Sequence, residues 1–74
     1  MKKVIEHQGN RYEMGAGFSE VRKGDVIKVE SGDLEIILGV DPLRNFEGVA
    51  IHTGLETYYT FLPNPILDYG KRVA

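Results

Sequence analysis

Apolar and polar residues alternate in short runs along this chain, and turn-forming residues separate the runs. The clearest example is VRKGDVIKVESGDLEIILGV at residues 21–40, where two alternating runs flank Ser31-Gly32-Asp33. Alternation with a period of two is typical of strands that bury one face, and a Gly-containing triplet between two such runs favours a hairpin. The stretch therefore predicts a β-hairpin within an all-β domain.

The same pattern predicts six strands, at residues 3–7, 11–14, 25–30, 34–40, 49–53 and 57–62. Gln8-Gly9-Asn10 is expected to join the first two strands in a hairpin, because Gly and Asn tolerate positive φ. Residues 19–20 could open a short helical turn. Residues 65–69 are expected to form one helical turn, with Asn64 as its cap and Pro65 at its first position. Residues 71–74 are expected to be a frayed tail.

The side-chain pattern also predicts the core. Alternate residues of the third and fourth strands are expected to face inward, namely Ile27, Val29, Leu34, Ile36, Leu38 and Val40. Gly39 within the fourth strand indicates a bulge or sharp bend. Asp41-Pro42 is expected to end that strand, since proline donates no hydrogen bond to a sheet, which leaves a functional loop at 41–48.

Length and composition favour one small domain over residues 1–74. Six short strands in 74 residues predict a small five- or six-stranded, partly open β-barrel with one short C-terminal helical turn, since closure protects edge strands. There is no cysteine, so disulfides, thiolate metal sites and a cysteine nucleophile are excluded. Because so short a chain buries little surface, good packing or self-association must compensate, and a homodimer is one expectation.

The charge pattern narrows the class of partner. The net charge is −2 and the isoelectric point is near 5.6, whereas domains that grip phosphate backbones are usually basic. Nucleic acid is therefore disfavoured, although a local basic patch stays open. No apolar run is long enough for a membrane span, and the N-terminal residues lack the apolar core of a secretory signal. The simplest expectation is a cytoplasmic protein without membrane contact, bacterial or phage-like in size.

Candidate chemistry is sparse. His7 and His52 are the two histidines, and neither lies in a recognised motif with the serine and threonine hydroxyls. Gly15-Ala16-Gly17 lacks the further glycine and the helix of a phosphate-binding loop. The acidic residues are scattered through turns and outward faces. We therefore expect no enzyme, no cofactor and no metal site, although a pocket holding His52 beside a carboxylate would favour catalysis.

The segment Val21-Arg22-Lys23-Gly24-Asp25-Val26-Ile27-Lys28-Val29 resembles the Gly-Asp turn and following strand of Src-homology-3 domains. Leu62-Pro63-Asn64-Pro65-Ile66-Leu67-Asp68-Tyr69 is loosely similar to the tight helical turn near that family's C-terminus. The resemblance covers residues 18–69 and implies a Src-homology-3-like barrel. The chain lacks tryptophan and the family's initial Ala-Leu-Tyr-Asp-Tyr run, so recognition of proline-rich peptides is not carried over.

Aromatic residues give the remaining clue to function. Tyrosine and arginine are enriched at interfaces because they combine large contact area with polar tips. The predicted partner-binding residues are Arg44, Phe46, Tyr58 and Tyr69. The expected function is a small non-enzymatic binding module that engages a protein partner or itself. The alternatives are a nucleic-acid-binding barrel that uses stacked tyrosines, and a phage-type acidic inhibitor of a nucleic-acid enzyme.

Overall fold

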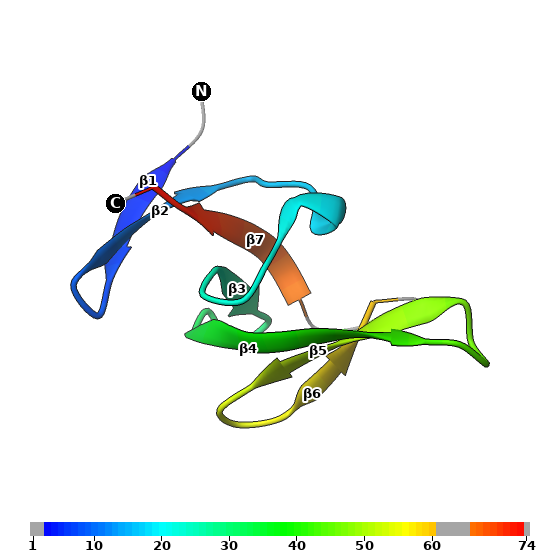
Figure 1. The fold of residues 1–74 in the computed structure, drawn as a ribbon. Helices are drawn as coiled ribbons and strands as arrows, with labels where there is room; N and C mark the ends of the chain where they lie inside the picture. The colour runs from blue at the N-terminus through cyan, green and yellow to red at the C-terminus, as the bar shows by residue number, and fades with distance from the viewer. Residues whose placement is uncertain (1–2, 61–65, 74) are drawn as a thin grey trace.

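The computed structural model describes residues 3–60 and 66–73 (Figure 1). Besides a 3₁₀ turn, η1 at Phe18–Glu20, the regular elements of these residues are strands. They are β1 (Val4–His7), β2 (Asn10–Met14), β3 (Val26–Val29), β4 (Leu34–Leu43), β5 (Gly48–Thr53), β6 (Thr57–Tyr59) and β7 (Ile66–Arg72). The predicted all-β class is confirmed, but seven strands are present where five or six were expected.

The strands form one antiparallel sheet in the order β1-β2-β7-β3-β4-β5-β6. The predicted hairpins β1–β2 and β3–β4 are both present, with His7 paired to Asn10 and Lys28 paired to Leu34. The C-terminal strand β7 returns through the middle of the molecule, between β2 and β3 (Figure 1). The sheet is open, and β1 and β6 are its two end strands.

The C-terminal region corrects two predictions. Residues 66–69 belong to β7 rather than to a helical turn, and Lys71 and Arg72 are paired in the same strand rather than frayed. The expected cap and stop at residues 61–65 lie outside the described residues. Long-range pairing overrides the local capping signal here, because residues 66–69 pair with β3 and residues 70–72 of the same strand pair with β2. Gly70 fits this central position, since a Cβ there would lie 2.5 Å from Met14 Sδ and 2.7 Å from Val26 Cγ2.

Both faces of the central strands are covered by apolar residues. The first cluster contains Val21, Ile27, Val29, Ile37, Ile51 and Tyr58. The second cluster contains Tyr12, Met14 and Val26, with Ile5, Leu34 and Ile36 packed against it. Because successive side chains of a strand point to opposite faces, neighbours such as Val26 and Ile27 belong to different clusters. The β1–β2 hairpin thus covers the face of β3 and β4 that lies opposite the first cluster.

The predicted inward stripe of β4 is wrong in part. Glu35 and Ile37 are buried on the side of the first cluster, whereas Leu34 and Ile36 are half-buried against the second. Leu38 is 51% exposed. The register shifts at this point, because Ile37 pairs with Thr53 while Gly39 pairs with His52.

This irregularity is the bend that Gly39 predicted. The unpaired residue at Leu38 reverses the side-chain alternation. Val40 therefore packs against the first cluster together with Ile37, although their positions differ by three, which in a regular strand would place them on opposite faces.

The expected loop at 41–48 is also shorter than predicted. Strand β4 continues through Asp41 and Pro42 to Leu43, and the connection to β5 is a turn at residues 44–47. The strand pairing of β4 with β3 ends at Ile36, so Pro42 lies on a stretch paired to β5 alone among the described residues. A proline is tolerated there because its missing N–H can fall on the unpaired edge.

Asp25 fixes the start of β3 to the end of β7. Its buried carboxylate accepts hydrogen bonds from the Arg22 amide at 2.8 Å, the Arg72 amide at 3.0 Å and Lys71 Nζ at 2.7 Å. Burial alone would raise the pKa of Asp25, but these hydrogen bonds and the Lys71 charge outweigh it and hold the pKa below its ordinary value. Gly24 precedes it with φ of +97°, a conformation that favours glycine.

Candidate functional site: grooves beside the first hairpin

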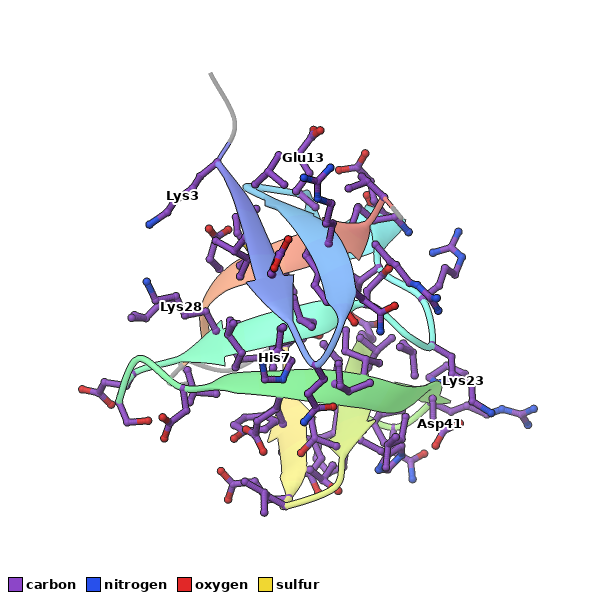
Figure 2. The ribbon with its side chains drawn as sticks, turned by 90° about the vertical axis from the view of Figure 1, so that its left-hand side faces the viewer. Lys3, His7, Glu13, Lys23, Lys28 and Asp41 are labelled. Atoms are coloured by element: carbon purple, nitrogen blue, oxygen red, sulfur yellow. The ribbon has the colours of Figure 1, made fainter. Side chains whose placement is uncertain are left out.

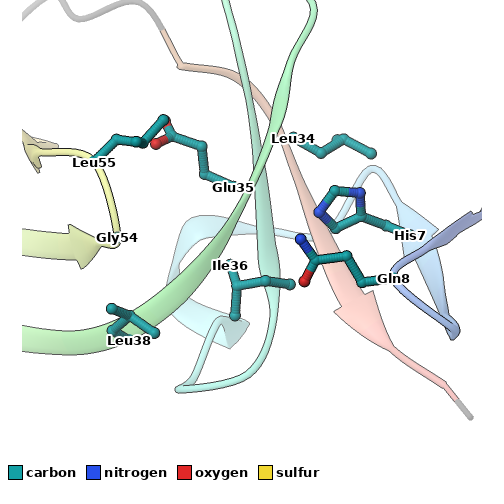
Figure 3. Close-up of a pocket in the computed structure, with 8 residues that line it drawn as sticks. All are labelled: His7, Gln8, Leu34, Glu35, Ile36, Leu38, Gly54 and Leu55. Carbon is teal, nitrogen blue, oxygen red and sulfur yellow. The ribbon is translucent and has the colours of Figure 1, made fainter.

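A shallow groove of about 400 Å³ lies between the β1–β2 turn and the β5–β6 turn, with β4 crossing between them (Figure 3). His7 and Gln8 line it from the first turn, and Gly54 and Leu55 line it from the second. In Figure 3, Leu34 and Ile36 point toward the His7 side, whereas Glu35 points toward Leu55. The lining from β4 consists of Leu34, Glu35, Ile36 and Leu38. The groove therefore joins segments from both ends of the sheet.

The walls of this groove expose apolar side chains to solvent. Leu55 is 83% exposed and Leu38 is 51% exposed. Leu38 is displaced outward by the irregularity in β4, and Leu55 lies in the turn between β5 and β6. Single exposed leucines are ordinary, but apolar residues gathered around one depression are typical of binding surfaces.

The floor on the Leu55 side is closed by a polar network. Glu35 is 6% exposed and accepts hydrogen bonds from the Tyr58 hydroxyl and, at 3.1 Å, from Thr53 Oγ1. The last cross-strand pair of β4 with β5 is Ile37 with Thr53, so this carboxylate spans the gap where the two strands separate. Burial, with the Glu35 and Glu56 carboxylates nearby, raises the pKa of Tyr58 far above its ordinary value, which keeps this phenol a hydrogen-bond donor.

A second groove of about 340 Å³ runs along β1, and Leu34 lines both grooves. Its other lining residues are Lys3, Ile5, Glu6, Met14, Lys28, Gly32 and Asp68. Figure 2 shows Lys3 and Lys28 on the same side of the molecule, beside the outer edge of β1. Among the described residues neither lysine forms an ion pair. The Asp68 carboxylate is occupied by the Gly15 and Tyr69 amides at 3.1 and 2.8 Å.

His52 lies beside a carboxylate and a hydroxyl on the outer surface of β4, β5 and β6. Its Nε2 lies 2.5 Å from Asp41 Oδ2, and its Nδ1 lies 3.1 Å from Thr57 Oγ1. These are residue types that general-base chemistry uses. The His52 and Asp41 side chains are 40% and 67% exposed, and neither they nor Thr57 line the grooves described above. The arrangement is therefore a cross-strand surface cluster, and the exposed contact between His52 and Asp41 contributes at most about 1 kcal/mol.

The four predicted partner-binding residues do not form one patch. Arg44 and Phe46 lie in the exposed turn between β4 and β5, where Phe46 is 64% exposed. Tyr69 lies half-buried on β7, with its ring centroid 6.0 Å from that of Phe18, and burial raises its pKa. Tyr58 is only 5% exposed, so it cannot offer the aromatic surface expected of it. Its hydroxyl is needed inside, because Glu35 would otherwise lose a partner.

Sequence reasoning missed the two leucines that flank the groove. Leu38 was predicted to face inward, and only the displaced register of β4 reveals its exposure. Leu55 had a usable signal, since a large apolar residue at the centre of the turn Gly54-Leu55-Glu56 has little reason to be buried. In the described part of the chain, no three His, Asp or Glu residues are grouped as metal ligands. Residues 3–60 and 66–73 also contain no helix long and apolar enough to cross a membrane.

Comparison with known proteins yields no match to a family model, to a curated protein or to a solved structure. Function is therefore inferred from the geometry of the chain itself.

Proposed function

We propose that this protein is a small non-enzymatic binding module that engages a protein partner, or a second copy of itself, through the groove between the β1–β2 and β5–β6 turns. The observation that carries the proposal is the exposure of Leu38 and Leu55 around this depression. Covering both side chains would remove apolar surface from water, which stabilises a complex by about 25 cal/mol for each Å² covered. The half-buried Leu34 and Ile36 would extend the contact into the groove.

The fold proposed for this module is a Src-homology-3-like barrel. Two observations support that assignment. Gly24 and Asp25 of the resembling segment lie in the turn that leads into β3, with Gly24 at positive φ. The last strand, β7, also returns between β2 and β3, which brings the two ends of the chain into one sheet and favours a curled architecture.

The test is affinity capture from the native cell with mass spectrometry, using the wild-type chain and a Leu38→Ser/Leu55→Ser double variant. Both positions are exposed, so the double variant is expected to fold, as checked by circular dichroism. Leu67→Ser is the matched control, because Leu67 is 61% exposed but does not line this groove. We expect a partner that is lost with the double variant and retained with the control. Equal recovery of the partner with all three chains would refute the proposal that this groove binds it.

The same variants separate the alternatives. A second copy as the partner predicts a dimer in analytical ultracentrifugation that the double variant dissociates. A nucleic-acid-binding barrel predicts affinity for a single-stranded oligonucleotide that falls steeply with salt, and affinity of that kind would argue against the protein-binding proposal. A Phe46→Ala variant in the same capture tests the exposed turn that sequence reasoning favoured.

A further inference from the structure

Along the outer edge of β1, backbone N–H and C=O groups have no neighbouring strand among the described residues to hydrogen-bond them. Strand β1 is an end strand, and among the described residues it pairs with β2 alone. The Lys3 carbonyl accepts a hydrogen bond from the Met14 amide at 2.7 Å, so the backbone groups of Lys3 point toward β2. Because these directions alternate along an antiparallel strand, the N–H and C=O groups of Val4 and Glu6 point to the open side. Such a row of groups is a template for another strand.

The space beside this edge suits an extended chain. The groove along β1 is bounded by Lys3, Ile5 and Glu6 on one side and by Lys28 and Gly32 on the other. Leu34 also lines the groove between the β1–β2 and β5–β6 turns, so apolar side chains extend from one groove into the other. A strand placed beside β1 would direct alternate side chains toward this apolar floor and the others toward solvent. The four residues of β1 would match about 13 Å of extended peptide.

The charges beside the edge indicate the chemistry of the occupant. Two lysines and two acidic residues line the groove, but Glu6 lies beside Arg11 and Asp68 accepts hydrogen bonds from backbone amides. Lys3 and Lys28 have no ion pair among the described residues, so they are the charges that a carboxylate of an incoming peptide would meet. A second copy of β1 would bring a single carboxylate, that of Glu6, which already lies 3.8 Å from Arg11 Nε of its own chain. An acidic peptide from another protein fits this edge better than β1 itself.

We infer that the edge of β1 is a docking site for an extended peptide of a partner protein, with apolar residues at alternate positions and an acidic residue facing Lys3 and Lys28. The peptide adds as a further strand, so backbone hydrogen bonds hold it and the groove selects its side chains. This inference rests on the proposed binding function and specifies its partner.

The experiment begins with a phage-displayed random heptapeptide library panned on the intact chain. The expected consensus alternates apolar residues and contains Asp or Glu. A synthetic consensus peptide is then titrated against the wild-type chain while amide hydrogen exchange is followed by NMR. Binding is expected to slow exchange at the Val4 and Glu6 amides by at least about tenfold, which corresponds to new hydrogen bonds at the open edge.

Three variants test the same site by affinity. Val4→Pro removes an outward N–H that the sheet does not use, and is expected to weaken the consensus peptide by at least about tenfold. Lys28→Glu is expected to weaken it about twofold to fivefold without touching the edge. Lys23→Glu is the matched charge control, since Figure 2 shows Lys23 on the opposite side of the molecule, and its affinity should match the wild type.

The outcomes separate this inference from the function on which it rests. A bound consensus peptide that leaves Val4 and Glu6 exchange unchanged overturns edge docking, and so does undiminished affinity in a folded Val4→Pro chain. The binding function survives either result if the Leu38→Ser/Leu55→Ser variant still loses its captured partner. If panning enriches no sequence and the wild-type chain forms a dimer that Val4→Pro dissociates, the edge binds a second copy, and the proposal of a peptide partner is wrong. Failure of both panning and capture overturns both proposals.

Discussion

Asp25→Asn tests the carboxylate that ties β3 to β7. The change preserves size and one acceptor oxygen, but it removes the charge and places an amide NH₂ among donors. Hydrogen bonds to a charged group contribute about 1.5–3 kcal/mol each, and Asp25 accepts three of them. Because these contributions are not additive and the Asn oxygen can still accept a weaker hydrogen bond, we expect the free energy of unfolding to fall by about 2–4 kcal/mol. A chain of 74 residues has only about 4–11 kcal/mol of stability, so this is a large fraction.

The assay is urea unfolding followed by circular dichroism at pH 7 and pH 3. The pKa of Asp25 is lowered in the folded chain from an ordinary value of 3.8. Its contribution is therefore fully present above that value and is lost as the pH falls through the folded pKa. The difference in free energy of unfolding between wild type and Asp25→Asn should be largest at pH 7 and shrink toward pH 3.

Asp33→Asn is the matched control, since Asp33 is an exposed aspartate whose side chain accepts a hydrogen bond from Ser31 alone among the described residues, and it should change the free energy of unfolding by less than about 0.5 kcal/mol. A gap at pH 7 no larger than that of the control, or one that does not depend on pH, would refute the role of Asp25.

Four further substitutions test the packing. Gly70→Ala is expected to cost about 1–3 kcal/mol in urea unfolding, because a Cβ would lie 2.5 Å from a packed sulfur atom, and a stability within about 0.5 kcal/mol of wild type would contradict this. Tyr58→Phe is expected to cost about 1.5–3 kcal/mol in urea unfolding and to leave unchanged the part of an alkaline absorbance titration near the ordinary phenol pKa, because burial and Glu35 raise the pKa of Tyr58, and a loss of amplitude in that ordinary range would refute the Glu35 contact. Ile37→Ala is expected to cost about 2–5 kcal/mol and Leu38→Ser less than about 0.5, and the opposite order would restore the predicted inward stripe.

Local features of the fold are predictable from the sequence because their causes are local. Gln8-Gly9 forms a turn in which both residues have positive φ, and Gly32 turns β3 into β4 in the same way. Gly39 marks the displaced register in β4. At both turns glycine supplies a positive φ at its own position, so reading neighbouring residues is enough to predict them, whereas Gln8 shares that conformation although its residue type does not favour it.

Features that depend on distant partners were not predictable in this way. Asn64 and Pro65 carry a capping signal, yet residues 66–69 become a strand because β3 pairs with them, while β2 pairs with residues 70–72 of the same strand. The candidate site shares this difficulty. Tyr58 is buried because Glu35, far away in the sequence, needs its hydroxyl, and Leu38 is exposed because the pairing of β4 with β5 skips it.

The face of each strand could not be read from alternation alone, because both faces of the central sheet are apolar. Val26-Ile27, Ile36-Ile37 and Ala50-Ile51 are adjacent apolar pairs, and in each pair both residues are at least half-buried. Such pairs are typical of strands covered on two sides, where a single inward stripe does not exist. Strand β1 also contains an adjacent apolar pair, Val4-Ile5, but only the Ile5 side is covered and Val4 is 53% exposed. Adjacent apolar residues therefore do not by themselves distinguish a central strand from an end strand, and the long-range pairing decides which strand is left at the edge where we propose that a partner docks.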